Sequence, residues 1–470
     1  GRNTARFEIW DGMRAIDYLQ SRPEVDSSRI GCTGNSGGGT QTSYLMSLDE
    51  RIIAAAPSCY ITGFERLLDT IGPQDAEQNI HGQIAFGMDH ADYLMMRAPT
   101  PILVCAATGD FFDISGTWNM FRYAKRLYTR LGFAERIDLM ENDAGHNYNQ
   151  LQRQSVVRWM SRWLLGKDEP LTEPEIKLLS EEQIQCTPGG QVMLIEGARS
   201  TYDLNRDFER ELARRRKKLW ATNDRAELLE NVRSIAGVRK LAEIPDPKVA
   251  TSGAAEREGY AIRKMTFSSA DGIRLPALMF VPAADAGGQR PVLYVHERGK
   301  AADAEPGGPI ETLVKSGRRV LAVDVRGAGE TYQYKPGGSA EGVGPRGKDV
   351  FTAYLLGRSY AGMRAEDVLV CARILQAELA GPVDVIAVGS VGVPVLHAAA
   401  LEPELFGAVK LERSLVSWAN VIELARSSGR QANAVYGALT MYDLPDLAAT
   451  LEEKLTVEEP RDALGEPLQE

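Results

Sequence analysis

Three residues, a serine, an aspartate and a histidine, occur in an order and at positions that could support nucleophilic chemistry. Ser36 lies in the stretch "GNSGG", which fits the pattern G-x-S-x-G. Asp110 follows the apolar run 101–107, and His146 follows the strand-like run 136–142. A serine hydroxyl is a weak nucleophile at neutral pH, so it needs a histidine base and a carboxylate that orients the base. Together the three residues predict acyl transfer through a serine.

The glycines around Ser36 would hold it in the geometry of a nucleophile. Gly34 and Gly38 lie two residues to either side, so the chain can turn sharply between a strand and a helix. The amide of Gly37 would then point to where an oxyanion forms. The simplest alternative is a glycine-rich turn that happens to contain a serine. A phosphate-binding loop is disfavoured, because no Gly-Lys-Ser/Thr follows.

The acid and the base each have rival candidates. Asp110 is preferred to Asp113 because it directly follows the glycine at the strand end, whereas Asp113 is placed to cap the next helix. His81 and His90 are weaker candidates than His146, and His90 precedes the acid in the chain, so it is expected to be structural. Each triad member also has a plainer interpretation, as a turn serine, a capping aspartate or a loop histidine. The agreement of three placements favours the triad.

Other residues near these positions give weaker signals. Phe111, Trp118 and Tyr148 flank the acid and the base and could line an acyl or sugar pocket, although such residues are more often core. No metal and no organic cofactor is implied. The cysteines show no CxxC spacing and are expected to be small buried side chains; they are Cys32, Cys59, Cys105, Cys186 and Cys371.

The elements that must position the triad alternate between strand and helix. Such alternation, with spacings too long for hairpins, predicts parallel strands joined by crossover helices, and the fold class is therefore α/β. Catalytic groups in such sheets gather at the carboxyl ends of the strands. Strands are expected at 29–33, 51–61, 101–107 and 136–142, and helices at 7–21, 118–131 and 151–165.

The second half of the chain repeats the α/β plan after a change of character. Residues 167–257 are charged and helix-prone, and we interpret them as a connecting segment. From 258 onward strands resume, with a hairpin signal at Asp271-Gly272. Strands and helices then alternate again, which predicts a second α/β unit over 258–470.

Composition excludes some classes of partner. The chain has 470 residues and a formal charge of −10, which argues against a nucleic acid or an acidic membrane surface as partner. No run of about 18 apolar residues occurs, so no membrane span is expected. The sequence does not indicate an oligomeric state or a compartment.

Three stretches resemble the α/β-hydrolase superfamily, namely "GCTGNSGGGTQTSYLMSLDERIIAAAPSCYIT", "CAATGDFFDISGTW" and "WDGMRAIDYL". The resemblance is to bacterial tandem-domain proteins similar to acetyl xylan esterases and prolyl-oligopeptidase-like hydrolases. It implies an α/β-hydrolase fold, with a mostly parallel sheet and helices on both faces. It also implies a serine esterase that forms an acyl-enzyme on a small-molecule or carbohydrate ester. A serine peptidase and a non-catalytic scaffold remain alternatives, and relatives of this type are often exported.

The resemblance is incomplete in both halves. Residues 1–166 would be the C-terminal part of a catalytic domain, because little chain precedes the nucleophile strand. Residues 258–470 would be a second hydrolase-like domain without its late strands, and Ser390 in "AVGSVGVP" is expected to be a turn serine. This domain is therefore expected to be non-catalytic. In a less favoured arrangement the two halves complete one permuted sheet, with His296–Gly299 near Ser36.

Overall fold

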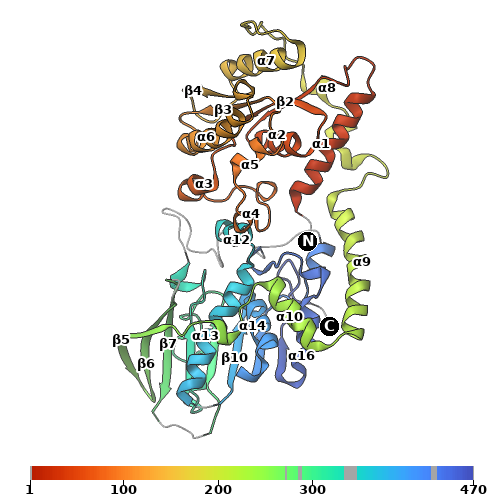
Figure 1. Ribbon diagram of the computed structural model, residues 1–470. Helices are drawn as coiled ribbons and strands as arrows, with labels where there is room; N and C mark the ends of the chain where they lie inside the picture. Colours follow the sequence, from red (N-terminus) through yellow and green to blue (C-terminus); the bar gives the residue numbers. More distant parts are fainter. Residues whose placement is uncertain are drawn as a thin grey trace. The chain divides into compact units, whose positions relative to one another are not determined.

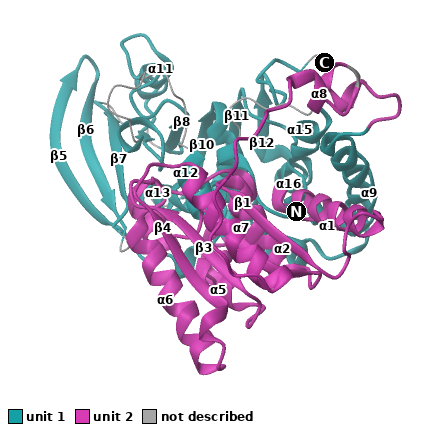
Figure 2. Cartoon of the chain, turned by 90° about the horizontal axis from the view of Figure 1, so that it is seen from above, with its two compact units in different colours: residues 1, 199–353, 358–470 teal, residues 2–198, 354–357 magenta. Residues whose placement is uncertain are grey.

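The computed structural model describes residues 3–269, 272–283, 288–332, 347–379, 381–424 and 431–468 (Figure 1). The chain divides into two compact units (Figure 2). Unit 1 comprises 199–353 and 358–470, and unit 2 comprises 2–198 and 354–357. This boundary falls inside the predicted connecting segment, and the three-part division of the chain at 166 and 257 stays a prediction. Among the described helices, none has the length and apolar character that crossing a membrane requires.

Unit 2 alternates strands and helices along the chain. Its elements are α1 (Thr4–Ser21), β1 (Ile30–Asn35), α2 (Gly37–Leu48), β2 (Ile52–Ser58), α3 (Phe64–Thr70), α4 (Gln83–Phe86), α5 (His90–Met95), β3 (Ile102–Ala107), α6 (Ile114–Arg130), β4 (Ile137–Asn142), α7 (Gln150–Leu165) and α8 (Glu181–Ile184). The four strands form one sheet in the order β1-β2-β3-β4, and each neighbouring pair is parallel. The alternation predicted from the sequence is confirmed here.

Both faces of this sheet are covered, which explains its apolar strands. β3 is buried at every position, as expected for a parallel strand between two layers of helices. Alternate residues point to opposite faces. Ile102 and Val104 pack in the core formed with α2, α5 and α6. Leu103 and Cys105 pack against Trp159 of α7 on the other face.

Helix ends in unit 2 follow local capping chemistry. The Asp113 side chain accepts a hydrogen bond from the Gly116 amide and begins α6. The Asn149 side chain accepts from the Gln152 amide and begins α7. α7 ends at Leu165, and the capping residue Gly166 that follows has a φ of 67°, which suits a glycine. These caps fix where the helices begin relative to the strand ends that precede them.

Unit 1 contains a larger sheet and more helices. Its elements are α9 (Thr201–Thr222), α10 (Arg225–Ala236), β5 (Lys248–Arg257), β6 (Tyr260–Ser268), β7 (Arg274–Pro282), β8 (Val292–His296), α11 (Pro309–Lys315), β9 (Val320–Val323), α12 (Gly347–Leu355), α13 (Tyr360–Leu379), β10 (Val383–Val388), α14 (Gly392–Leu401), β11 (Phe406–Glu412), α15 (Trp418–Leu424), α16 (Leu444–Leu451) and β12 (Leu455–Glu458). The last residues of α12 are assigned to unit 2.

The sheet of unit 1 is mixed, which corrects the expectation of a mostly parallel sheet. Its order is β12-β11-β10-β8-β9-β7-β6-β5. The strands from β12 to β9 pair in parallel, whereas β9-β7, β7-β6 and β6-β5 are antiparallel. For β5-β6 and β6-β7 the cause is connection length, because a short turn can join only antiparallel strands. The predicted hairpin joins β6 to β7, with Gly272 at a φ of 82°, while Asp271 lies outside the described residues.

In unit 1, as in unit 2, apolar side chains pack on both faces of the sheet. Leu293 and Val295 of β8 pack toward α10, α13, α14 and α16. Val292 and Tyr294 pack on the opposite face, with Ile310 of α11. The described strands thus form two sheets, each within one unit, and not one permuted sheet.

Truncation of β3 tests this packing. Ile102 is 1% exposed, so Ile102→Ala should lower the free energy of unfolding of unit 2 by about 2–5 kcal/mol, from lost burial and the cavity left behind. Leu165→Ala is the control: Leu165 is 53% exposed, and the change should stay within about 0.5 kcal/mol. Hydrogen exchange of unit 2 peptides across a urea series measures both. Equal effects of the two substitutions would contradict the assigned core.

Candidate active site

The four parallel strands of unit 2 bring four side chains to one edge of the sheet. Ser36 follows β1, Cys59 follows β2, Asp110 comes soon after β3, and His146 comes soon after β4. Main-chain hydrogen bonds also tie the residue that follows β1 or β2 to the next strand. The Ser36 amide donates to the Ser58 carbonyl of β2 at 3.0 Å, and the Cys59 amide donates to the Cys105 carbonyl of β3 at 2.9 Å. These bonds fix the start of each loop against the neighbouring strand.

The loops that carry the acid and the base are also joined. The Thr108 amide donates to the Asn142 carbonyl, and the Gly109 amide donates to the Ala144 carbonyl, both at 2.9 Å. Backbone bonds of this kind fix a loop more firmly than side-chain contacts do, because they immobilise the chain itself. The position of Asp110 relative to the histidine loop is therefore set by the sheet.

Ser36 has a strained backbone. Its φ is 60° and its ψ is −121°, in a region that residues other than glycine rarely occupy. It stands between the last residue of β1 and the first residue of α2. Gly37 opens α2, and the first amides of a helix have no partner within the helix. This is the geometry expected of a nucleophile elbow, and the role of the Gly37 amide in holding an oxyanion stays a prediction.

Two glycines permit the close approach that this turn requires. A Cβ atom on Gly34 would lie 2.5 Å from the Gly38 carbonyl oxygen, and one on Gly39 would lie 2.3 Å from the Ser58 carbonyl oxygen. Gly38 itself has no neighbour within 4 Å of its Cβ position. Glycine is therefore required at positions 34 and 39, where a Cβ atom would clash with the backbone, and it is not required at position 38.

Substitution at adjacent glycines tests this close approach. Gly39→Ala should disrupt the contact between α2 and the end of β2, and it should destabilise unit 2 by at least about 2 kcal/mol through overpacking. Gly38→Ala should be neutral or stabilising by up to about 1 kcal/mol, because alanine favours the helix. Hydrogen exchange of unit 2 compares them. If Gly38→Ala proves the more harmful change, the assigned turn geometry is wrong.

Asp110 and His146 are in direct contact. His146 Nδ1 lies 2.9 Å from both carboxylate oxygens of Asp110. The aspartate side chain is 1% exposed and the histidine side chain 22% exposed. Asp110 Oδ1 also accepts a hydrogen bond from the Phe112 amide at 3.1 Å. A buried carboxylate held in this way can fix the Nδ1–H tautomer of the imidazole, which leaves Nε2 free to accept a proton.

Other predicted residues lie at varying distances from this pair. The ring of Phe111 lies against the His146 ring, with 4.3 Å between centroids. The Tyr148 hydroxyl lies 2.9 Å from the Thr33 hydroxyl, on β1. Trp118 lies in α6 and is 38% exposed. Their part in substrate binding stays a prediction.

The rival acid and base have structural partners. Asp113 forms two hydrogen bonds with the Arg66 guanidinium, at 3.1 and 2.9 Å, besides capping α6. The His90 ring is buried, and its Nδ1 accepts hydrogen bonds from the Thr62 and Gly63 amides. Burial lowers the pKa of His90 to about 4, so the ring is neutral at physiological pH.

The cap at Asp113 gives a pH-dependent prediction. Hydrogen bonding from Arg66, followed by that from the Gly116 amide, lowers the pKa of Asp113 to about 2. Because the folded pKa is below the unfolded value near about 4, the stabilisation is complete above about pH 4 and is lost as the pH falls toward 2. Asp113→Ala should therefore cost about 1 kcal/mol at pH 7 and less at pH 2 to 3.

A neutral cap supplies the matched control. Asn149→Ala at the start of α7 should cost a similar amount at every pH in this range, since asparagine does not ionise. Hydrogen exchange or proteolysis of unit 2 at pH 7 and pH 3 compares the two variants. A constant cost for Asp113→Ala would contradict the charge-based account of this cap.

Cys59 is the residue at this edge that sequence reasoning missed. It is 2% exposed, and its φ is 52°. Its Sγ lies 3.5 Å from the Asn147 carbonyl oxygen and 3.6 Å from Gln152 Nε2. Burial raises the pKa of the thiol, and the Asp110 carboxylate raises it further. One signal was available: Cys59 directly follows a strand between those that carry the serine and the acid.

The corresponding turn of unit 1 differs. Gly389, not Ser390, has the positive φ, and Ser390 lies in a short 3₁₀ turn. The Ser390 amide donates to the Glu297 carboxylate at 2.8 Å. A Cβ on Gly389 would lie 2.2 Å from Glu297 Cδ, so the carboxylate packs directly against this turn. The interpretation of Ser390 as a turn serine agrees with this geometry.

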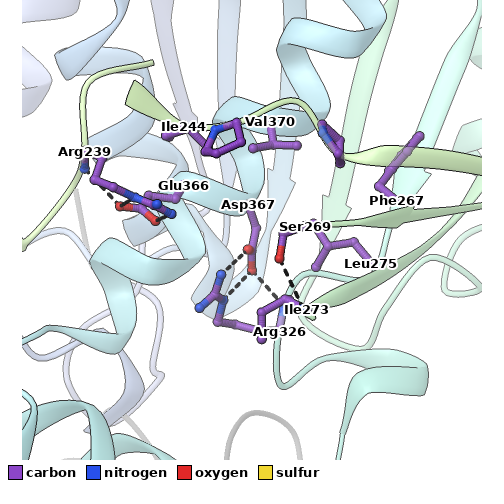
Figure 3. Close-up of a pocket in the computed structure, with 12 residues that line it drawn as sticks. Arg239, Ile244, Phe267, Ser269, Ile273, Leu275, Arg326, Glu366, Asp367 and Val370 are labelled. Carbon is purple, nitrogen blue, oxygen red and sulfur yellow. Dashed lines mark hydrogen bonds and ion pairs between the residues drawn. The ribbon is translucent and has the colours of Figure 1, made fainter. Parts of the chain in front are cut away.

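A cavity of about 30 Å³ lies elsewhere in unit 1 (Figure 3). Its charged groups satisfy one another, because Arg326 pairs with Asp367 and Arg239 pairs with Glu366. The volume suits about one water molecule. It is therefore too small for a substrate. The residues that line it belong to unit 1, whereas Ser36, Asp110 and His146 belong to unit 2.

Comparisons with known proteins place the chain near hydrolases. No family model matches it. It is 27% identical over 165 residues to "Putative hydrolase YtaP" of Bacillus subtilis, which covers 33% of this chain and 53% of that protein. The chain thus spans about half the length of this curated relative.

Among the solved structures that this chain resembles are proteins whose titles name esterases. One is a "putative acetyl xylan esterase" from Bacteroides fragilis, with 15% identity and a TM-score of 0.43 over 57% of this chain and 77% of the other. Another is acetyl xylan esterase 1 from Thermoanaerobacterium, with 20% identity and a TM-score of 0.36 over 53% and 90%. The name of the curated relative, a putative hydrolase, agrees with the hydrolase class that the resemblance predicts.

Proposed function

We propose that this chain is a carboxylic ester hydrolase that works through Ser36, His146 and Asp110. The observation that carries the proposal is the hydrogen-bonded pair of His146 and Asp110 at the same sheet edge as a serine with a φ of 60°. The order serine, acid, histidine along the chain is the order of α/β-hydrolases.

In the proposed mechanism, His146 Nε2 takes the proton of the Ser36 hydroxyl while Oγ attacks the ester carbonyl. Asp110 holds the Nδ1–H and stabilises the imidazolium that forms. The Gly37 amide donates to the oxyanion of the tetrahedral intermediate. His146 then protonates the leaving alcohol, and water releases the acid from the acyl-enzyme by the same steps in reverse.

The finer assignment of substrate depends on similarity alone. The titles of two similar structures name acetyl xylan esterases, and we propose an acetyl ester of a carbohydrate as the substrate. Phe111, beside the His146 ring, offers an apolar surface for a small acyl group. Trp118 and Tyr148 are the further candidates for substrate contact.

A fluorophosphonate probe tests the mechanism. The activated Ser36 hydroxyl would attack phosphorus, forming an Oγ–P bond and releasing fluoride, with the proton passing to His146. Mass spectrometry should find the adduct on the peptide that contains Ser36. Ser36→Ala should abolish labelling, and Asp110→Asn should slow it by about 10³-fold or more, because the imidazole loses its orienting carboxylate.

Asp113→Asn is the matched control for the acid, since Asp113 lies three residues away but caps a helix. It should label at nearly the wild-type rate. A folded wild-type protein that does not label, or one in which Asp113→Asn is the slower variant, would overturn the proposal. With labelling established, hydrolysis of acetyl esters against proline-containing peptides decides between an esterase and a peptidase.

A further inference from the structure

We propose that Cys59, Asp110 and His146 form a binding site for a thiophilic divalent cation such as Zn²⁺, and that the bound cation and the acid–base pair exclude each other. The consequence for activity rests on the proposed function, whereas the binding itself does not.

The three residues offer ligand atoms that lie close together. One thiol sulfur, one carboxylate oxygen and one imidazole nitrogen all lie within 4.8 Å of one another. Two ligands on one tetrahedral zinc ion are separated by roughly 3.4 Å, so small movements would close the set around an ion. Sulfur, nitrogen and oxygen are the ligand types that Zn²⁺ uses in proteins.

A second observation at this place concerns Gln152. Its side chain is fully buried, its Nε2 donates to Cys59 Sγ at 3.6 Å, and its Oε1 has no hydrogen-bond partner. A buried amide oxygen without a partner is costly. Beside Cys59, it supplies a polar group that could accept a hydrogen bond from water bound to the ion.

Charge also favours a divalent cation here. The thiol loses its proton to solvent on binding, and Asp110 is 1% exposed. One thiolate and one carboxylate carry two negative charges, which a divalent ion neutralises within a buried site. A monovalent cation or a bare thiolate would leave an unbalanced charge among these groups.

Binding and catalysis compete for one imidazole nitrogen. We place the ion on Nδ1, the imidazole nitrogen that faces Asp110. With the cation on Nδ1, the imidazole proton resides on Nε2, and the ring no longer accepts a proton from a serine. The bound cation would therefore switch off the proposed hydrolase reversibly.

Cobalt serves as the spectroscopic probe of binding. Protein freed of metal with a chelator is titrated with Co²⁺, and coordination by a thiolate should give a near-ultraviolet charge-transfer band that saturates at one equivalent. Cys59→Ser and His146→Ala should each weaken Co²⁺ binding about 100-fold or more. Cys186→Ser, which removes an exposed thiol elsewhere in unit 2, should leave the band unchanged.

The two variants keep the test decisive if one of them misfolds, because His146 is partly exposed and tolerates truncation better than buried Cys59. Circular dichroism checks the fold of each. A band that persists in both folded variants, a band that depends on Cys186, or no band at one equivalent of Co²⁺ would overturn the proposal.

A labelling experiment links the site to activity. At ten times its dissociation constant, Zn²⁺ should slow fluorophosphonate labelling of the wild type and of Cys186→Ser about tenfold, by mass action. The two experiments distinguish a failure of the metal site from a failure of the proposed hydrolase. A cobalt band without serine labelling in metal-free protein would sustain the metal site and reject the hydrolase, whereas labelling without a band would do the reverse.

Discussion

The parallel hydrogen-bond ladder of β1 to β4 is the constraint on which the candidate site depends. It places four strand ends at one edge, and it continues past the strands through bonds such as those from the Ser36 and Cys59 amides. Residues more than 100 positions apart in sequence are thereby brought to the same edge. The Asp110–His146 pair adds a direct side-chain bond there, at 2.9 Å.

Steric fit in the serine turn adds a second constraint. The strained φ of Ser36 persists because α2 and the end of β2 hold the backbone on both sides. The missing side chains of Gly34 and Gly39 allow this approach. The strained backbone, the close packing at Gly34 and Gly39, and the place of the turn at the sheet edge together fix the position of Ser36.

Much of unit 2 could be predicted because its strands are short apolar runs with turn residues at their ends. β1 to β4 begin and end within a few residues of the predicted runs. The hydrogen bond of Asp110 with His146 could be inferred only from the fact that each residue comes soon after a strand. β5 was missed because it is exposed along its whole length, and its small and polar residues show no apolar alternation that would mark a strand. The contacts of Cys59 are tertiary, so an apolar run could not reveal them.

The carboxylate beside Ser390 has a consequence for the chemistry of the second sheet. Glu297 lies against the turn at Gly389 and accepts the Ser390 amide. An alkoxide forming there would face a fixed negative neighbour, and the electrostatic work of creating it would rise accordingly. The two serines of one polypeptide thus differ in their neighbours: a carboxylate lies against the turn at Ser390, whereas the sheet edge that carries Ser36 also carries the pair of His146 and Asp110.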